Sequence, residues 1–126
     1  MDLRTPLARV LGSGSAKEGS HNWRAQRVTA LVLTPLTIWL VGSLIVMSGA
    51  SYEAAVRWLS SPIVASLMLV FVAALCYHAH LGMQVVIEDY VHTPWLKFTL
   101  LLTFQFAMLL LALVSMLAIL RVAVGA

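Results

Sequence analysis

Two histidines, His78 and His80, lie inside a stretch that has no Asp, Glu, Lys or Arg from Leu59 to Ile87. His78 is 11 residues before Asp89, which is about 16 Å along a helix. In a membrane-spanning helix that position is near the middle of the bilayer, where an ionisable residue indicates a function. Neutral imidazole is a common metal ligand and an axial ligand of haem iron. His78 is therefore either a ligand or an interhelical hydrogen-bond donor.

Helical spacing separates the residues around His78. At about 100° per residue, His80 points about 200° away, so one helix cannot offer both rings to one ion. We expect His80 to be structural, hydrogen-bonded to a neighbouring helix. Gly82 is close to the His78 face and leaves room either for a flat macrocycle or for another helix. Asp89 returns to within about 20° of that face if the helix persists, with Tyr90 at the membrane surface.

Sets of residues that catalyse reactions are not evident in the sequence. There is no serine–histidine–acid set, no Cys-x-x-Cys and no phosphate-binding glycine loop. The single cysteine, Cys76, cannot form an intramolecular disulfide and is interpreted as a packing residue. We do not expect catalysis by this chain alone.

The elements that carry these residues follow from the composition. The chain has 126 residues, of which 61% are apolar and 10% charged, against about 25% charged in a soluble domain. Three stretches long enough to cross about 30 Å of hydrocarbon lack charges, and their apolar runs do not alternate as β-barrel strands do. We predict an all-α integral membrane protein, a single domain 1–126 with transmembrane helices at 27–49, 62–88 and 96–121.

Local signals refine these boundaries. Residues 1–26 are rich in glycine and serine, and we expect much of this segment to be extended. Pro35 predicts a kink in the first span, and residues 51–59 form a connector with helical character. Ser61 and Pro62 suit the N-cap and first position of the second helix. A short loop at 90–94 leads to the third span.

The basic residues predict the orientation. Five of them precede the first span: Arg4, Arg9, Lys17, Arg24 and Arg27. By the positive-inside rule the N-terminus is cytoplasmic, and the 90–97 loop lies on the same side. The net charge of +3 is ordinary beside a membrane and indicates membrane lipid, and no nucleic acid, as the partner of these residues. We expect no cleaved signal peptide, since a short apolar core with a cleavage site is missing.

The segment from His78 to His92 reads HAHLGMQVVIEDYVH. It resembles the signature of the hydrophobic membrane-anchor subunits of succinate dehydrogenase, which reads His-x-His-x-Gly and then Gln-Val-Val-x-Asp-Tyr-Val-His. Gly19-Ser20-His21 and Arg27-Val28-Thr29-Ala30 are similar to the Gly-x-His and Arg-x-Thr-Ala patterns of the same family. The resemblance extends from about Gly14 to the third span. One departure is Glu88, where the pattern often has threonine.

The resemblance implies half of a heterodimeric helix bundle in the bacterial inner membrane. Its partners would be a cytochrome b anchor subunit, an iron–sulfur subunit and a flavoprotein subunit. A haem b would lie between the two anchors, with His78 as this chain's axial ligand. Arg27, and more weakly His21, would lie near the haem propionates. Tyr90 would bind ubiquinone, with Asp89 in the same site.

The implied role is electron transfer from succinate oxidation to ubiquinone, in the citric acid cycle and the respiratory chain (complex II). The chain would be a subunit of this enzyme that is not catalytic alone. Three alternatives stay open: a haem-free structural anchor, a fumarate reductase anchor and a small transporter subunit. The last is disfavoured because charges at mid-membrane and paired broken helices are missing.

Overall fold

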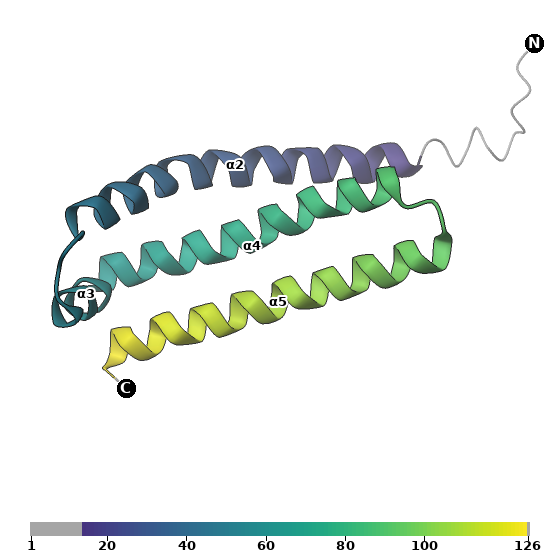
Figure 1. Cartoon of the computed structure of the whole chain (residues 1–126). Coiled ribbons are helices and arrows are strands. Elements are labelled where there is room, and N and C mark those ends of the chain that lie inside the picture. Colours follow the sequence, from purple (N-terminus) through teal and green to yellow (C-terminus); the bar gives the residue numbers. More distant parts are fainter. Residues whose placement is uncertain (1–13, 126) are drawn as a thin grey trace, which may run out of the picture.

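Three long helices lie side by side in one layer (Figure 1). The structure, a computed structural model, describes the backbone of residues 14–125 and the side chains of residues 19–125. The helices are α2 (Gly14–Val46), α4 (Pro62–Tyr90) and α5 (Pro94–Val124), and a short α3 (Tyr52–Leu59) follows α2. No strand occurs within the described range. The all-α prediction is confirmed.

The first helix begins earlier than predicted. α2 starts at Gly14 rather than near residue 27, so the expectation of an extended segment is wrong for residues 14–26. Residues 1–13 lie outside the described part of the chain. The physical reason is local: Ala16, Lys17, Ala25 and Gln26 are strong helix formers. They outweigh the neighbouring glycines and serines, because a helix already anchored in an apolar span needs no new nucleus.

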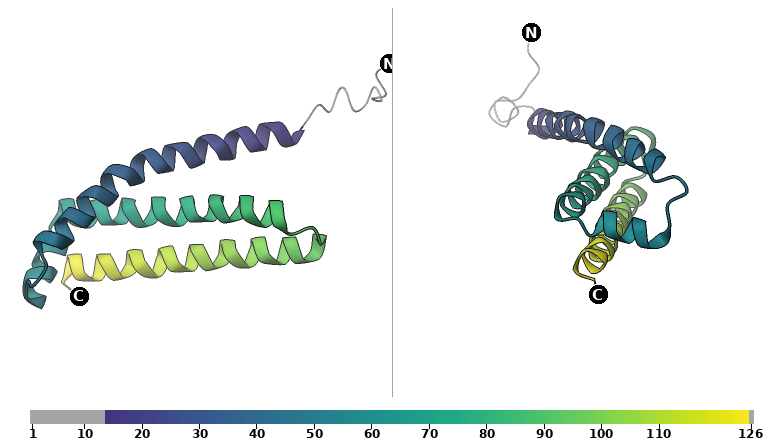
Figure 2. Two further views of the ribbon diagram at one scale, coloured as in Figure 1. Left: turned by 45° about the horizontal axis from the view of Figure 1, so that its top comes forward. Right: turned by 90° about the vertical axis from the view of Figure 1, so that its left-hand side faces the viewer.

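The C-terminal half of α2 is bent. The helix is continuous through Pro35, and it curves toward α3 (Figure 2, left). A proline removes one backbone hydrogen bond and pushes against the preceding turn, so the predicted kink has its cause there. After α2 the chain turns at Gly49, whose φ of 84° is a conformation that favours glycine.

α3 is the helical connector predicted at 51–59. Ser51 is its N-cap and accepts a hydrogen bond of 3.3 Å from the backbone N–H of Ala54. Hydrogen bonds from the backbone at this helix start, and then from Ser51, lower the pKa of the Glu53 carboxyl below its ordinary value. The rings of Trp39 and Trp58 stack with centroids 5.9 Å apart. α3 is thereby tied to α2 and lies across the ends of α4 and α5 (Figure 2).

The second and third spans begin at prolines. Ser61 is the N-cap of α4 and Pro62 its first residue, as predicted, although the Ser61 side chain makes no capping hydrogen bond. α5 begins in the same way at Pro94 and ends before Gly125, a left-handed C-cap. The helices run to Tyr90 and Val124, slightly beyond the predicted ends at 88 and 121. The loop is therefore short, residues 91–93.

The helices leave most of their apolar surface uncovered. α4 packs against α2 on one side and α5 on the other, and this contact buries few side chains: Leu33, Ala65, Leu81, Ile87 and Ile119. The most apolar windows of the three long helices are only 11%, 11% and 6% buried. Each helix is long and apolar enough to cross a membrane. The chain is a multi-pass membrane protein whose outer faces require lipid or partner helices.

Candidate functional site

The N-terminal half of α2 lies along the C-terminal half of α4. The two helices run in opposite directions, so the start of α2 and the end of α4 lie at the same end of the molecule (Figure 1). Two contacts fix their alignment. Thr29 meets His78, and one turn further on Gln26 lies over Gly82. Moving toward the N-terminus on α2 therefore means moving toward Tyr90 on α4.

His78 is half-buried and faces α2. Its Nδ1 atom lies 2.8 Å from Oγ1 of Thr29. Within the described residues, the buried side-chain atoms that lack a hydrogen-bond partner are Oε1 of Gln26 and Nδ1 of His80. The second ring nitrogen of His78, Nε2, is not among them. His78 is thus held at Nδ1, and the described chain gives Nε2 no hydrogen bond.

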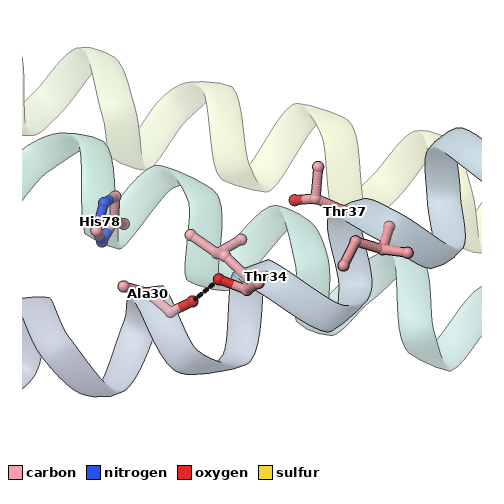
Figure 3. A pocket seen from close by; sticks show the side chains of 6 residues that line it. Ala30, Thr34, Thr37 and His78 are labelled. Carbon is pink, nitrogen blue, oxygen red and sulfur yellow. Dashed lines mark hydrogen bonds between the residues drawn. The ribbon is translucent and has the colours of Figure 1, made fainter.

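An open groove of about 370 Å³ lies beside His78. Its remaining lining comes from α2, and Figure 3 shows Ala30, Thr34 and Thr37 on that helix with His78 on α4. The Thr34 hydroxyl donates to the backbone carbonyl of Ala30 at 2.8 Å, so its one proton is used inside α2. The groove offers an imidazole at the edge of a surface made of small residues and the aliphatic side chains of Leu33 and Ile38.

Gly82 does not open into this groove. A Cβ atom added there would lie 3.5 Å from Nε2 of Gln26, an ordinary contact distance. The approach of α2 therefore does not require a glycine here, and both interpretations left open by the sequence stay predictions.

His80 faces the other side of α4, as helical spacing predicts. It lines a second groove of about 360 Å³ with Gln105 and Met108 of α5. The expected hydrogen bond to a neighbouring helix is not made by its Nδ1 atom, which is buried without a partner in the described chain. Gln105 shares the groove and makes no hydrogen bond to the ring in the described chain, so this part of the expectation stays a prediction. His78 and His80 thus serve different helix contacts.

Arg27 and His21 lie about 120° apart around α2. Arg27 is seven residues before Thr34, or two helical turns, so both lie on the side that carries the groove. The Arg27 guanidinium is exposed and lies 5.4 Å from the centroid of the Trp23 ring. His21 is nine residues before Ala30, about two and a half turns, and so points away from the groove. The geometry therefore brings Arg27, and not His21, toward the His78 groove.

Asp89 and Tyr90 lie at the end of α4, at a different depth from His78. The helix persists through Tyr90, so the condition for placing Asp89 within about 20° of the His78 face is met. Tyr90 is 12 residues from His78, about 18 Å along the axis, and it is 80% exposed. Gln84 donates a hydrogen bond of 2.9 Å to Glu88, and Asp89 and Tyr90 are both exposed.

Thr29 is the site residue that sequence reasoning did not single out. It stands in the Arg27-Val28-Thr29-Ala30 pattern, but a threonine in an apolar helix commonly bonds its own backbone. The distance to His78 appears only once α2 and α4 are aligned. Among the described residues, no three His, Cys, Asp or Glu side chains form a group that could hold a metal ion.

Comparison with known proteins identifies the family of the chain. A family model described as succinate dehydrogenase/fumarate reductase transmembrane subunit matches residues 1–119. The chain belongs to this family. A Rickettsia bellii (strain RML369-C) protein named succinate dehydrogenase hydrophobic membrane anchor subunit is 38% identical over 101 residues, which cover 80% of this chain and 81% of the relative.

Further members of the family agree with this assignment. The Rickettsia conorii (strain ATCC VR-613 / Malish 7) protein of the same name is 36% identical over 105 residues, covering 82% of this chain and 83% of its own. A Reclinomonas americana protein named succinate dehydrogenase membrane anchor subunit is 32% identical over 79 residues, 60% of this chain and 66% of the relative. The resemblance seen in the sequence is confirmed.

Proposed function

We propose that this chain is the membrane-anchor subunit of a succinate:ubiquinone oxidoreductase, and that it supplies one axial ligand of a haem b and part of a ubiquinone site. The observation that carries the proposal is the half-buried imidazole of His78, held at Nδ1 by Thr29 beside an open groove. An ionisable ring at this depth costs free energy in lipid, so its presence indicates a function. Family membership supplies the kind of complex.

The residues at the groove fit a haem. The Nε2 atom of His78 can coordinate iron, and the small lining side chains Ala30 and Thr34 leave space beside the ring. Arg27 lies on the same side of α2, toward the end where Tyr90 lies, and a guanidinium binds carboxylates in a bidentate manner. A bound haem would supply one-electron redox chemistry. This chain would bind and orient the group, with Arg27 offsetting the charge of the propionates.

The ubiquinone site is assigned to the end of α4. The Tyr90 phenol is exposed and can donate a hydrogen bond to a quinone carbonyl. The Asp89 carboxylate precedes it and can hold or pass on a proton as the quinone is reduced. Both lie about 16–18 Å from His78 along α4. Electrons could therefore reach the quinone without passing the haem groove.

The remaining subunits would supply the second haem ligand and the other side of the quinone site. The second axial ligand is proposed to come from a cytochrome b anchor subunit, which would also cover the uncovered faces of α2 and α4. The iron–sulfur and flavoprotein subunits would dock at the Tyr90 end. In this arrangement the flavin and the clusters oxidise succinate, and the anchors position the acceptor.

The purification that tests this role uses a tagged chain isolated from native membranes with mild detergent. We expect a flavoprotein, an iron–sulfur protein and a second small membrane protein to copurify, with succinate:ubiquinone activity in the same fraction. Copurification of fumarate reductase subunits that favour fumarate reduction would assign the chain to the other branch of the family. Isolation of the chain without any redox subunit would contradict the proposal.

The proposed orientation, with the N-terminus in the cytoplasm of a bacterial inner membrane, has its own test. Ser20, near the start of α2, and Ala50, four residues after its end, are both exposed. In a Cys76→Ser background, a membrane-impermeant maleimide should label Ala50→Cys in spheroplasts. It should label Ser20→Cys only in inverted vesicles, because the basic residues keep that end inside. The reverse labelling pattern would place the N-terminus outside.

A further inference from the structure

The Thr29 hydroxyl has three neighbours within hydrogen-bond distance. Its Oγ1 atom lies 2.8 Å from the carbonyl oxygen of Ala25 and 3.0 Å from that of Gln26, both in its own helix. It also lies 2.8 Å from Nδ1 of His78 on α4. A hydroxyl has one proton to donate and two lone pairs that accept. The direction of the bond to His78 is therefore set by where this one proton goes.

The backbone carbonyls decide that direction. A carbonyl oxygen can only accept, so the contacts to Ala25 and Gln26 are favourable only when Thr29 donates to them. If the hydroxyl instead donated to His78, its oxygen would face two carbonyl oxygens at 2.8 and 3.0 Å without a proton between them. In the first arrangement the two carbonyls share the one hydroxyl proton, and the hydroxyl oxygen accepts from His78. The Nδ1 atom of His78 then carries the proton and donates it to Thr29.

The protonated Nδ1 atom leaves a lone pair on Nε2, because a neutral imidazole has one donor and one acceptor nitrogen. The hydrogen bond at one nitrogen determines which nitrogen is free to bind a metal, and it also fixes the ring orientation. Thr29 is itself rigid, since its β-branched side chain is bonded to its own helix. The contact between α2 and α4 thus selects one tautomer and one rotamer of His78.

We propose that Thr29 is a positioning residue that holds His78 in the Nδ1–H tautomer and so presents Nε2 as a ligand. For iron bound at Nε2 this inference rests on the proposed function. Donation from Nδ1–H to the hydroxyl increases the electron density at Nε2 and stabilises the oxidised metal. Loss of the acceptor therefore raises the reduction potential and weakens binding, by the factor of about 10–100 that is typical for partners of metal-bound histidines.

The test compares Thr29→Val, which keeps the shape and removes the hydroxyl, with Thr29→Ser, which keeps the hydroxyl. Thr99→Val is the matched control, since among the described residues the Thr99 hydroxyl bonds the backbone of Trp95 in its own helix, at 2.8 Å, and no other helix. In the purified complex we expect Thr29→Val to retain about tenfold less haem or to show a more positive midpoint potential. Thr29→Ser and Thr99→Val should match the wild type.

A second measurement keeps the test independent of haem. In the ¹⁵N-histidine-labelled full chain, prepared without haem in lipid nanodiscs, nitrogen shifts assigned with His78→Gln should show a protonated Nδ1 in the wild type and loss of this preference in Thr29→Val. A wild-type proton on Nε2, or identical spectra and potentials for wild type and Thr29→Val, would overturn the inference. Haem retained by His78→Gln alongside the expected tautomer would remove the haem role and leave the positioning role supported.

Discussion

The substitution His78→Ala is expected to remove most of the haem from the purified complex. In the proposed role the imidazole of His78 is a ligand of the iron, and a methyl group at this point of the groove cannot replace it. We expect the haem content per flavin to fall by about tenfold or more, since even changes at the partners of metal-bound histidines cost factors of about 10–100. The absorbance of the reduced pyridine haemochrome, normalised to flavin, measures the change.

The control for this prediction is His80→Ala. It removes the same ring from the same helix two residues away, but on the side that faces α5. Its Nδ1 atom has no hydrogen bond to lose, so the complex should assemble with its haem. Haem that persists in His78→Ala at the wild-type level would show that this chain does not supply the ligand. A loss of equal size in both variants would indicate damage to α4 rather than loss of a ligand.

The spans could be predicted from the sequence because charge and hydropathy act locally. An ionised side chain at mid-membrane costs a few kcal/mol, so the charges that bound each uncharged stretch place its helix within a few residues. The start of α2 at Gly14 was missed because the membrane sets only where an apolar span must be, and not how far its helix continues into water.

The side-chain contacts between helices could not be predicted from the sequence. Helical spacing showed that His78 and His80 point apart, but it could not say which neighbour each ring meets. That required the alignment of α2 with α4, which rests on Thr29 opposite His78 and Gln26 over Gly82. The sequence also could not predict that the Nδ1 atom of His80 lacks a hydrogen-bond partner among the described residues. This depends on where Gln105 of α5 comes to lie, and no spacing within α4 determines that.

His78 and Tyr90 divide the chain into two regions of different chemistry. The His78 region lies against α2 beside an open groove, and Nδ1 of His78 is paired inside the chain with Thr29. The Tyr90 region is at the helix end, with a phenol that is 80% exposed. A group bound at His78 is therefore controlled by helix packing, whereas a molecule bound at Tyr90 depends on the partner subunits. Substitutions in the two regions should have separable effects.

Tyr90→Phe provides that separation for the quinone. The change keeps the ring and removes the phenolic donor, so the complex should assemble with its haem and oxidise succinate normally with an artificial acceptor. Ubiquinone reduction should fall by about fivefold in kcat/KM, the factor that corresponds to about 1 kcal/mol for one hydrogen bond. The two activities, measured on one preparation with phenazine methosulfate and with a short-chain ubiquinone, give the ratio directly.

Tyr77→Phe is the matched control for this prediction. Tyr77 is on the same helix, 13 residues before Tyr90, and lines the groove between α4 and α5, so removal of its hydroxyl should leave the ratio unchanged. An unchanged ratio in Tyr90→Phe would assign the tyrosine to the membrane surface alone, where aromatic rings are common. A lower ratio together with lost haem would mean that the end of α4 and the His78 region are coupled, because a phenol about 18 Å away along the helix cannot contact the iron directly.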